Sequence, residues 1–556
     1  MPDVIEPAAT FAELLLRRAD DDRVALLAED LAWTWRELIA HAGRRAAVMS
    51  EMSFDGPRHV GVLLENTPEY VAWIYGAALA RTTIVGINPT RRGEALAQDI
   101  RHTDCDVIVT DRERHGLIAG LDLSHASDRT LLVDSSDFAD RVRQAEPTYL
   151  AADPADRLLL LFTSGSTGAP KAVICTTGRL ARTSTGAVQS LGIRPDDVLY
   201  QAMPLFHGNA IMANLAPALA LAAPVALRRR FSASQFLTDV RRYDATYFNY
   251  VGRSLAYVLA TPRRPDDHEN SLRLGFGTEA SMRDRAEFTD RFGCDLLETY
   301  GSSEGVIATY RPPGAPPNSI GMPQPRPGSD VAVVDASTST ECPRAVFGAA
   351  GGLVNGDEAI GEIVDRGGAV GFEGYYRNEA ATTERIRDGW YWTGDLAYRD
   401  DAGYFYFAGR SLDWLRVDSE NFAAAPVEAV ISRHPDVVMA AVYAVPDPRT
   451  GDQVMAALEL RAGATFDPAG FAAFLKQQAD LGTKWAPRFV RIVAAMPLTA
   501  TNKVDKAPLR RAQWDVDGEV FERTGSDISY EVLTRDARAE LRAAFGRHGR
   551  TDLLPS

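Results

Sequence analysis

The sequence predicts an α/β protein: a large N-terminal domain of parallel α/β subdomains with a small β-barrel-like unit, followed by a smaller α+β C-terminal domain. The chain has 556 residues, a length that favours roughly three to four folding units. Helical and strand-like segments alternate from residue 10 to about 310. Seven prolines between residues 311 and 329 then exclude a helix, and short strand-like segments follow them.

The elements of the N-terminal part can be read in order from their periodicity. Helices are expected at 11–18, 35–49, 234–243 and 281–292. Short apolar runs predict buried strands at 60–64, 107–110, 130–133, 157–162, 198–202, 245–250 and 273–277. Alternation of this kind predicts mostly parallel sheets with helices on both faces.

The pattern of the sequence changes after the proline-rich segment. Strands are expected at 330–334 and 361–364, and a hairpin at 398–410 turns at Asp400-Asp401-Ala402-Gly403. A helix is expected at 425–432 and a polar, helical tail at 530–548. We therefore expect one domain at 1–410, with its β-rich unit near 330–410, and a second at 411–556.

Composition excludes several classes of protein. A net charge of −15 disfavours non-specific nucleic-acid binding, which needs a basic face. The four cysteines are widely spaced, so they predict neither a zinc site nor a disulfide framework and fit a reducing cytoplasm. The first residues do not resemble a signal peptide. The longest apolar stretch, 211–227, is short and contains two prolines, so we expect core there, with peripheral membrane contact left open.

The most informative segment is Thr163-Ser-Gly-Ser-Thr-Gly-Ala-Pro-Lys171, which follows a predicted strand. Glycines let the backbone approach an anion closely, and hydroxyls add hydrogen-bond donors. We therefore expect a polyphosphate ligand, although the common nucleotide P-loop pattern is absent. The alternative is a flexible Ser/Gly surface loop.

Further segments have the residue types of a chemical site. They are Met203-Pro-Leu-Phe-His-Gly208, Gly275-Phe-Gly-Thr-Glu279, Glu298-Thr-Tyr-Gly-Ser-Ser-Glu304, Trp392-Thr-Gly-Asp395, Gly409-Arg410 and Pro497-Leu-Thr-Ala-Thr-Asn-Lys503. Taken singly, His207 suits a core histidine, Asp395 a turn residue and Lys503 a surface charge. Their occurrence together, downstream of a phosphate loop, favours one shared site.

In this order the segments resemble the adenylate-forming superfamily of acyl-CoA synthetases, peptide-synthetase adenylation domains and firefly-type luciferases. The resemblance covers residues 10–512. Residues 225–236, 249–252 and 419–422 are most similar to the fatty-acid transport protein and very-long-chain acyl-CoA synthetase branch, near bacterial fatty-acid and steroid-acid CoA ligases. The resemblance implies that a carboxylate attacks the α-phosphate of Mg-ATP to give acyl-AMP and pyrophosphate, and that the CoA thiol then displaces AMP.

The resemblance also assigns roles to residues. Lys503 would be the catalytic lysine between the carboxylate and the α-phosphate, His207 would position the carboxylate, and Thr163 and Glu304 would bind Mg²⁺. ATP or AMP would contact Thr163, Ser164, Gly165, Ser166, Thr167, Gly168, Lys171, Gly277, Thr278, Glu279, Glu298, Thr299, Tyr300, Ser303, Asp395, Arg410 and Arg416. Asp395 would accept hydrogen bonds from the ribose hydroxyls. The acyl pocket would contain Met212, Tyr250, Val251 and Tyr257, and the CoA loop Asp418, Ser419 and Glu420.

In the family, the C-terminal domain is mobile. It swings about a hinge after the position of Arg410, so that one pose delivers the lysine and the other builds the thiolation site. This chain departs from the pattern there. Leu412 stands where Asp or Lys is common, Asp418-Ser419 where a glycine pair is usual, and Asn502 where a glycine often precedes the lysine. Glycine lets a backbone pass close to a ligand, and Asn tolerates left-handed backbone well.

Three functions are therefore weighed. The first is a CoA ligase for a hydrophobic acid, since alanines and tyrosines in 210–219 and 247–258 suit a long chain or a sterol side chain. The second passes acyl-AMP to a carrier protein. The third is an inactive nucleotide-binding paralogue, which the presence of Lys503, Glu304, Asp395 and Arg410 argues against. A homodimer is suggested by the resemblance alone.

Overall fold

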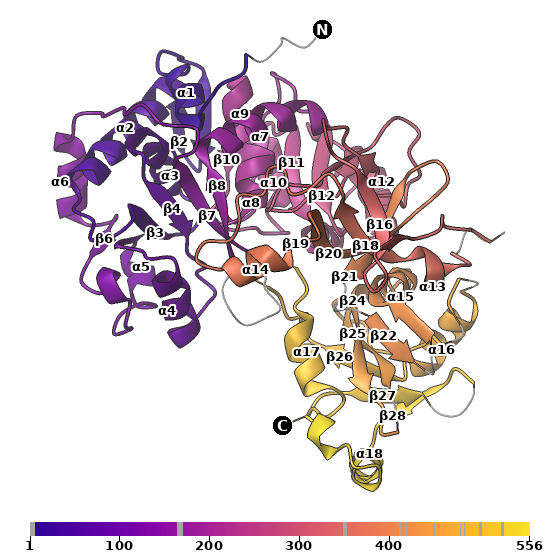
Figure 1. Ribbon diagram of the computed structural model, residues 1–556. Coiled ribbons are helices and arrows are strands. Elements are labelled where there is room, and N and C mark those ends of the chain that lie inside the picture. The colour runs from indigo at the N-terminus through magenta and orange to yellow at the C-terminus, as the bar shows by residue number, and fades with distance from the viewer. Residues whose placement is uncertain are drawn as a thin grey trace.

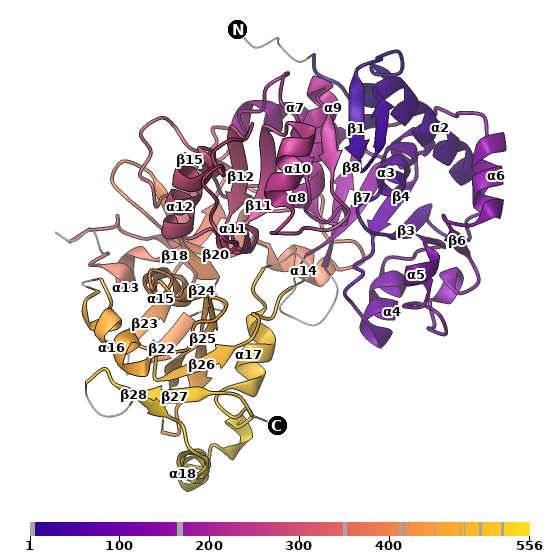
Figure 2. The ribbon, with the colours of Figure 1, turned by 180° about the vertical axis from the view of Figure 1, so that it is seen from behind.

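The computed structural model describes residues 6–163, 171–348, 353–410, 414–417, 420–449, 451–478, 480–482, 484–499, 503–523 and 527–555. The predicted mixed α/β architecture is confirmed, with a large N-terminal and a smaller C-terminal part. The C-terminal elements lie together below the two parallel sheets in both views of the ribbon (Figures 1 and 2).

The first parallel sheet has six strands in the order β6-β5-β3-β4-β7-β8. They are β3 (His59–Leu63), β4 (Thr83–Gly86), β5 (Val107–Thr110), β6 (Thr130–Leu132), β7 (Arg157–Thr163) and β8 (Lys171–Thr176). Neighbours run parallel except β7 and β8. The accompanying helices are α2 (Trp35–Glu51), α3 (Pro68–Ala80), α4 (Gly93–His102), α5 (Arg112–His115) and α6 (Ser136–Gln144). The four strands predicted here are confirmed.

The second sheet has seven strands in the order β13-β12-β11-β9-β10-β1-β2. They are β1 (Val24–Ala28), β2 (Leu31–Thr34), β9 (Leu199–Gln201), β10 (Val225–Leu227), β11 (Tyr247–Val251), β12 (Leu274–Thr278) and β13 (Asp295–Glu298). Its helices are α1 (Phe11–Leu16), α7 (Thr177–Ser190), α8 (Gly208–Ala210), α9 (Ala216–Leu221), α10 (Phe236–Tyr243), α11 (Gly252–Leu259) and α12 (Met282–Phe292). The strands expected at 198–202, 245–250 and 273–277 and the four expected helices of the N-terminal part are confirmed.

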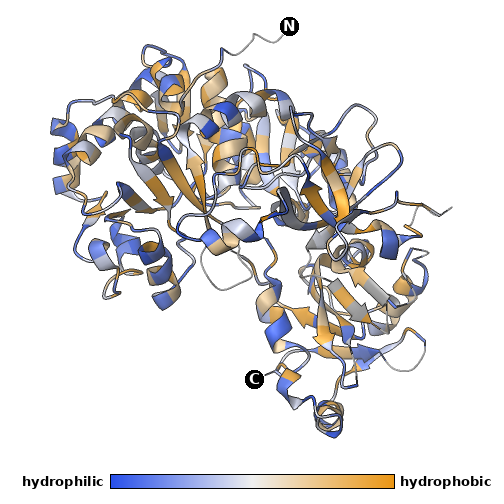
Figure 3. Ribbon diagram, in the orientation of Figure 1, coloured by the Kyte–Doolittle hydropathy of each residue, from blue (hydrophilic) through white to orange (hydrophobic). Residues whose placement is uncertain are grey.

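The two parallel sheets share one hydrophobic core. It joins Leu159 of β7 to Leu199 of β9 and includes buried residues of α2, α3 and α9. The apolar stretch 211–227 is also part of this core, as expected. No described helix is both long and apolar enough to cross a membrane. Figure 3 shows hydrophobic residues concentrated on the strands and hydrophilic ones on outer helices such as α6.

An antiparallel sheet follows the proline-rich segment. Its order is β17-β16-β18-β20-β19, and β21 also pairs with β20. The strands are β16 (Val331–Asp335), β17 (Thr340–Glu341), β18 (Gly361–Asp365), β19 (Ile386–Arg387), β20 (Trp390–Arg399) and β21 (Phe405–Arg410), with helices α13 (Gly356–Ala359) and α14 (Glu379–Glu384). A short pair, β14 (Thr309–Tyr310) and β15 (Met322–Pro323), precedes it. The predicted hairpin is confirmed, because Asp395 to Arg399 pair with Arg410 to Phe405.

The C-terminal part is built on a five-stranded sheet in the order β24-β25-β26-β27-β28. Its strands are β24 (Val437–Pro446), β25 (Asp452–Leu460), β26 (Phe489–Val493), β27 (Val520–Arg523) and β28 (Tyr530–Val532). The hairpin β22 (Trp414–Val417) and β23 (Glu420–Ala423) precedes it, and the helices are α15 (Ala424–Ile431), α16 (Pro468–Lys476), α17 (Lys506–Ala512) and α18 (Arg535–Arg547). The prediction of a helix from residue 530 was wrong at its start. Tyr530 is buried in β28, and its hydroxyl donates to the Pro487 carbonyl at 2.9 Å.

Candidate active site

A large cavity lies between the N-terminal sheets and the C-terminal part, with a volume of about 2220 Å³. Strands β9, β11, β12 and β13 of the seven-stranded sheet all end near it, because the carboxyl ends of parallel strands share one edge of a sheet, and β7 of the six-stranded sheet ends near it as well. Its walls include residues from 203–208, 276–279, 298–305, 392–395 and 503–507. The structure therefore brings together five of the segments that the sequence analysis singled out.

The wall around Gly277 is fixed by tight packing. A Cβ atom at Gly277 would lie 2.3 Å from the Tyr250 ring, so only glycine fits there. The Tyr250 hydroxyl donates to Glu298 Oε1 at 3.2 Å, and the Ala280 amide donates to the same oxygen at 2.9 Å. Burial raises the pKa of Glu298. Glu298 thus connects Tyr250 to the loop after β12 by hydrogen bonds and holds that loop in place.

That loop carries an ion pair between the two parts of the molecule. Lys503 Nζ donates to Glu279 Oε1 at 2.5 Å. Glu279 has a left-handed backbone with φ of +69°, which is uncommon for a residue with a side chain. Gly252 makes room for it, since a Cβ there would lie 2.1 Å from the Glu279 carbonyl oxygen. The predicted catalytic lysine is therefore held inside the cavity by a carboxylate on the loop after β12.

Tyr300 and Asp395 form a second contact in the cavity. The Tyr300 hydroxyl donates to Asp395 Oδ2 at 2.7 Å. Burial is the main cause that raises the pKa of Tyr300 well above its ordinary value, and the charge of Asp395 is the second. The phenol therefore stays protonated and remains a donor. Asp395 lies opposite Arg410 in the β20–β21 ladder. An aspartate fixed in this way can accept hydrogen bonds on its remaining lone pairs.

A third group surrounds Tyr375, a residue that the sequence analysis did not identify. Its hydroxyl donates to Glu304 Oε1 at 2.7 Å and accepts a hydrogen bond from Arg385 Nε at 3.2 Å. Burial, and next the Glu304 carboxylate, raise the pKa of Tyr375. Lys171 Nζ lies 5.8 Å from the centre of the Tyr375 ring and 3.4 Å from Glu384 Oε2.

Glu304 suits a divalent cation. It is 7% exposed, and in the described chain no cationic side chain lies within ion-pair distance of it. A buried carboxylate that faces a cavity and has no directly paired cation is a fitting oxygen ligand for Mg²⁺. Thr163 lines the same cavity, and its hydroxyl donates to the Lys171 carbonyl at 3.4 Å. Its oxygen keeps free lone pairs for a metal.

The predicted acyl-pocket residues divide into two groups. Met212 and Val251 line the cavity, together with His207 and Gly208. Tyr250 and Tyr257 are not among the cavity-lining residues. Tyr250 is buried beneath Gly277, as described above. The Tyr257 hydroxyl donates to Glu459 Oε1 at 2.9 Å and Oε2 at 3.2 Å, and Glu459 belongs to β25 of the C-terminal part.

The other predicted residues are placed as follows. Thr278, Thr299 and Ser303 line the cavity. Ser164, Gly165, Ser166, Thr167, Gly168, Asp418 and Ser419 lie outside the described residues, as do Leu412 and Asn502. For Arg410, Arg416 and Glu420 only the backbone is described, in β21, β22 and β23.

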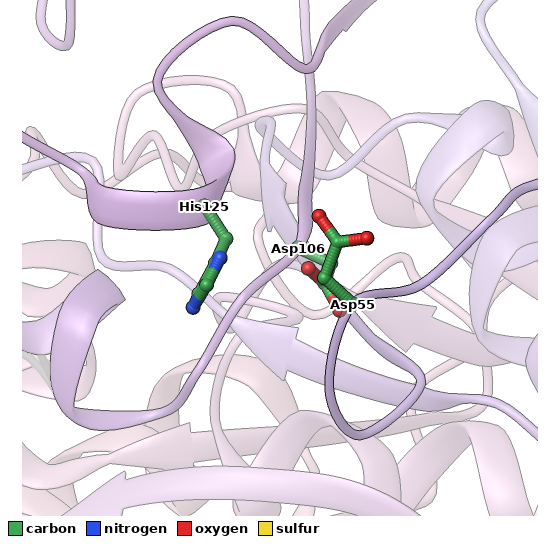
Figure 4. Close-up of side chains that lie close together, drawn as sticks. All are labelled: Asp55, Asp106 and His125. Carbon is green, nitrogen blue, oxygen red and sulfur yellow. The ribbon is translucent and has the colours of Figure 1, made fainter.

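A separate group of side chains away from the cavity consists of Asp55, Asp106 and His125 (Figure 4). Their ligand atoms lie within 4.8 Å of one another. Arg129 already neutralises the carboxylates, with its guanidinium 2.9 Å from Asp55 and 3.5 Å from Asp106. This arrangement ties the loop before β3 to the start of β5, and we assign it a structural role.

Known proteins match this chain along nearly its whole length. Residues 16–376 match the family model described as AMP-binding enzyme, and residues 426–503 match the AMP-binding enzyme C-terminal domain. A steroid-22-oyl-CoA synthetase of Rhodococcus jostii (strain RHA1) is 50% identical over 550 residues, which cover 98% of this chain and 99% of that protein. The medium/long-chain-fatty-acid–CoA ligase FadD17 of Mycobacterium tuberculosis is 46% identical, over 90% of this chain and 96% of its own.

Solved structures agree in fold. ATP-bound MatB from Rhodopseudomonas palustris superposes with a TM-score of 0.79 at 24% identity, covering 92% of this chain and 99% of that one. The anthranilate CoA ligase AuaEII in complex with anthranoyl-AMP gives a TM-score of 0.78 at 24% identity, covering 90% and 97%.

Proposed function

Because this chain belongs to the AMP-binding enzyme family, we propose that it is an ATP-dependent acid–CoA ligase that activates a hydrophobic carboxylic acid as acyl-AMP. The observation that carries the proposal is the placement of Lys503. It comes from the C-terminal part, yet its ammonium group lies in the cavity against Glu279. The same cavity is lined by Asp395 and Glu304.

The residues supply what adenylation requires. An acid anion must approach a polyanion, so fixed positive charge has to offset the repulsion. Lys503 would exchange its one carboxylate partner, Glu279, for two anions, the acyl carboxylate and the α-phosphate, whose mutual repulsion its charge would offset. Mg²⁺, held by Glu304 and Thr163, would neutralise phosphate charge when bound. The acid is already ionised at neutral pH, so His207 has a positioning role and not that of a base.

The nucleotide would lie between β12 and β20. Asp395, held by Tyr300, would accept the ribose hydroxyls, and Thr278 and Thr299 would border the base. Lys171 and the hydroxyl-rich loop before it would bind the β- and γ-phosphates. Tyr250 and Glu298 act indirectly, through the backbone of the loop after β12.

For the acid, we favour a bulky hydrophobic substrate such as a steroid side-chain acid. The cavity of about 2220 Å³ includes the space between the two parts of the molecule and leaves room for an acid beside the nucleotide. The Rhodococcus relative is named for steroid-22-oyl substrates. A medium- or long-chain fatty acid is the second candidate, because the FadD17 relatives carry that name. We place the reaction in the cytoplasm, where four free, buried thiols stay reduced.

The test is a mass-spectrometric screen of purified protein with Mg-ATP, CoA and a panel of acids from short to very long chains, including sterol-derived acids. A CoA thioester with one hydrophobic class supports the proposal and identifies the acid. Acyl-AMP that accumulates without thioester would indicate a carrier-protein acceptor instead. ATP binding without pyrophosphate release for any acid would indicate an inactive paralogue.

A further inference from the structure

Arg385 stands just after α14, at the edge of the cavity. Its backbone is fixed because the Trp392 amide donates to the Arg385 carbonyl at 2.8 Å. With the residues that the structure describes, its side chain makes two hydrogen bonds, from Nε to the Tyr375 hydroxyl at 3.2 Å and from Nη1 to the Trp392 carbonyl at 3.3 Å. Both acceptors are neutral. A guanidinium has five N–H donors, so several are left for a ligand.

Two opposite charges share the Tyr375 hydroxyl without a direct ion pair. Within the described part of the chain, no carboxylate lies within ion-pair distance of the Arg385 guanidinium. Glu304, on the other side of the same hydroxyl, acts on Arg385 only through its electrostatic field. Buried charges are stabilised most by partners in direct contact. A cation on Glu304 and an anion on Arg385 would give each of them such a partner.

The neighbourhood identifies the anion. Lys171 ends the predicted phosphate loop, and its ammonium group lies over the ring of Tyr375, whose hydroxyl binds Arg385. Lys171 is paired with Glu384, the residue before Arg385. Gly394 leaves space beside the guanidinium, because a Cβ there would lie 2.7 Å from Arg385 Nη1. Two cations, Lys171 and Arg385, therefore flank one tyrosine next to the proposed metal ligand.

We propose that Arg385 binds the β- and γ-phosphates of ATP, and the pyrophosphate formed from them, across Tyr375 from the metal ligand Glu304. Planar guanidinium groups bind phosphate oxygens in pairs, which a lysine cannot do. This inference rests on the proposed function for the identity of the nucleotide. It adds a phosphate-binding residue from the segment between α14 and β19, close to Lys171 of β8.

The test is calorimetric binding of ATP, AMP and inorganic pyrophosphate to the full-length protein without acid, so that no turnover occurs. For Arg385→Ala we expect affinity for ATP and pyrophosphate to fall about tenfold to 100-fold, the range for a lost charge-assisted hydrogen bond. AMP affinity should change by less than about twofold on the same reasoning. Arg385→Lys should recover part of the loss, since it restores the charge without the fork.

Arg344→Ala is the matched control. Arg344 belongs to the same region, pairs with Glu341 at 3.2 Å and does not line the cavity. Equal losses for ATP and AMP, or unchanged ATP affinity, would overturn the inference. If Arg385→Ala does not fold, the same measurements are made on Arg385→Gln, because the glutamine amide can still donate to Tyr375 or Trp392. Wild-type protein that binds ATP but activates no acid would defeat the proposed function and leave this binding test intact.

Discussion

Replacing Tyr257 by phenylalanine tests whether the orientation of the C-terminal part governs the first reaction step. The change removes one hydroxyl, which donates to the buried Glu459 carboxylate across the boundary between α11 and β25. A hydrogen bond to a charged group contributes about 1.5–3 kcal/mol. A free-energy change of about 1.4 kcal/mol alters an equilibrium constant tenfold. The orientation that places Lys503 in the cavity should therefore lose about tenfold to 100-fold in population relative to the other orientation. Glu459 keeps the Met496 amide, 2.7 Å away, as a donor.

The assay separates the two half-reactions. Pyrophosphate release reports acyl-AMP formation, and thioester formation from supplied acyl-AMP reports the second step. We expect Tyr257→Phe to slow the first by up to the factor above and to leave the second unchanged or faster. Tyr243→Phe is the control, because among the described residues the Tyr243 hydroxyl donates to the Glu29 carbonyl of the N-terminal part, at 3.4 Å, and to no residue of the C-terminal part. Equal slowing of both steps, or none in the first, would refute the reasoning.

Three further predictions address the lysine, the cavity wall and the pH dependence of stability. Lys503→Ala should lower acyl-AMP formation by at least about 10²–10³-fold, while thioester formation from supplied acyl-AMP survives; equal loss in both half-reactions would count against domain alternation. Gly277→Ala forces a Cβ against the Tyr250 ring, so we expect a loss of about 1–3 kcal/mol in thermal unfolding and weaker ATP binding, and an unchanged melting temperature would contradict the packing. Burial raises the pKa of Asp99 from 3.8 to about 6, although Arg91 lies 3.0 Å away. The stability associated with protonated Asp99 is therefore complete below pH 3.8 and lost as pH rises through 6. Asp99→Asn should be more stable than wild type at pH 8, by at most about 3 kcal/mol, with the difference vanishing near pH 4 in paired melting curves; a constant difference would contradict the shift.

The parts of the fold that could be predicted are those whose secondary structure is determined by the hydrophobic pattern of a short segment. Apolar runs such as 107–110 and 157–162 are strands because they are buried on both faces of a parallel sheet. The motifs at 275–279 and 298–304 follow strands, and parallel strands direct their carboxyl ends to one edge. Their meeting in one cavity therefore follows from topology.

The remaining features depend on contacts between distant segments. Arg385 lies in a polar run that looks like any solvated helix end, and only its bond to Tyr375 makes it notable. Tyr257 was expected in the acyl pocket, but its hydroxyl donates to Glu459 of β25, a partner 202 residues further along the chain. The strand at Tyr530 forms because β27 offers an edge for pairing, and the apolar and polar alternation at Tyr530-Glu531-Val532 is too short to distinguish it from a helix start.

Residues of both the N-terminal and the C-terminal part line the cavity. A nucleotide bound there would therefore connect the two parts. The two large hydrophobic clusters of the C-terminal part contain only residues after 414, so that part has a core of its own. It is joined to the rest by polar contacts, including Lys503 to Glu279, and by a small hydrophobic cluster of Leu396, Ala408 and Ala423. A molecule that contacts Lys503 and Asp395 together would add its binding energy to that junction. Heat-induced unfolding of the two parts should then merge from separate transitions into one cooperative event as the site fills.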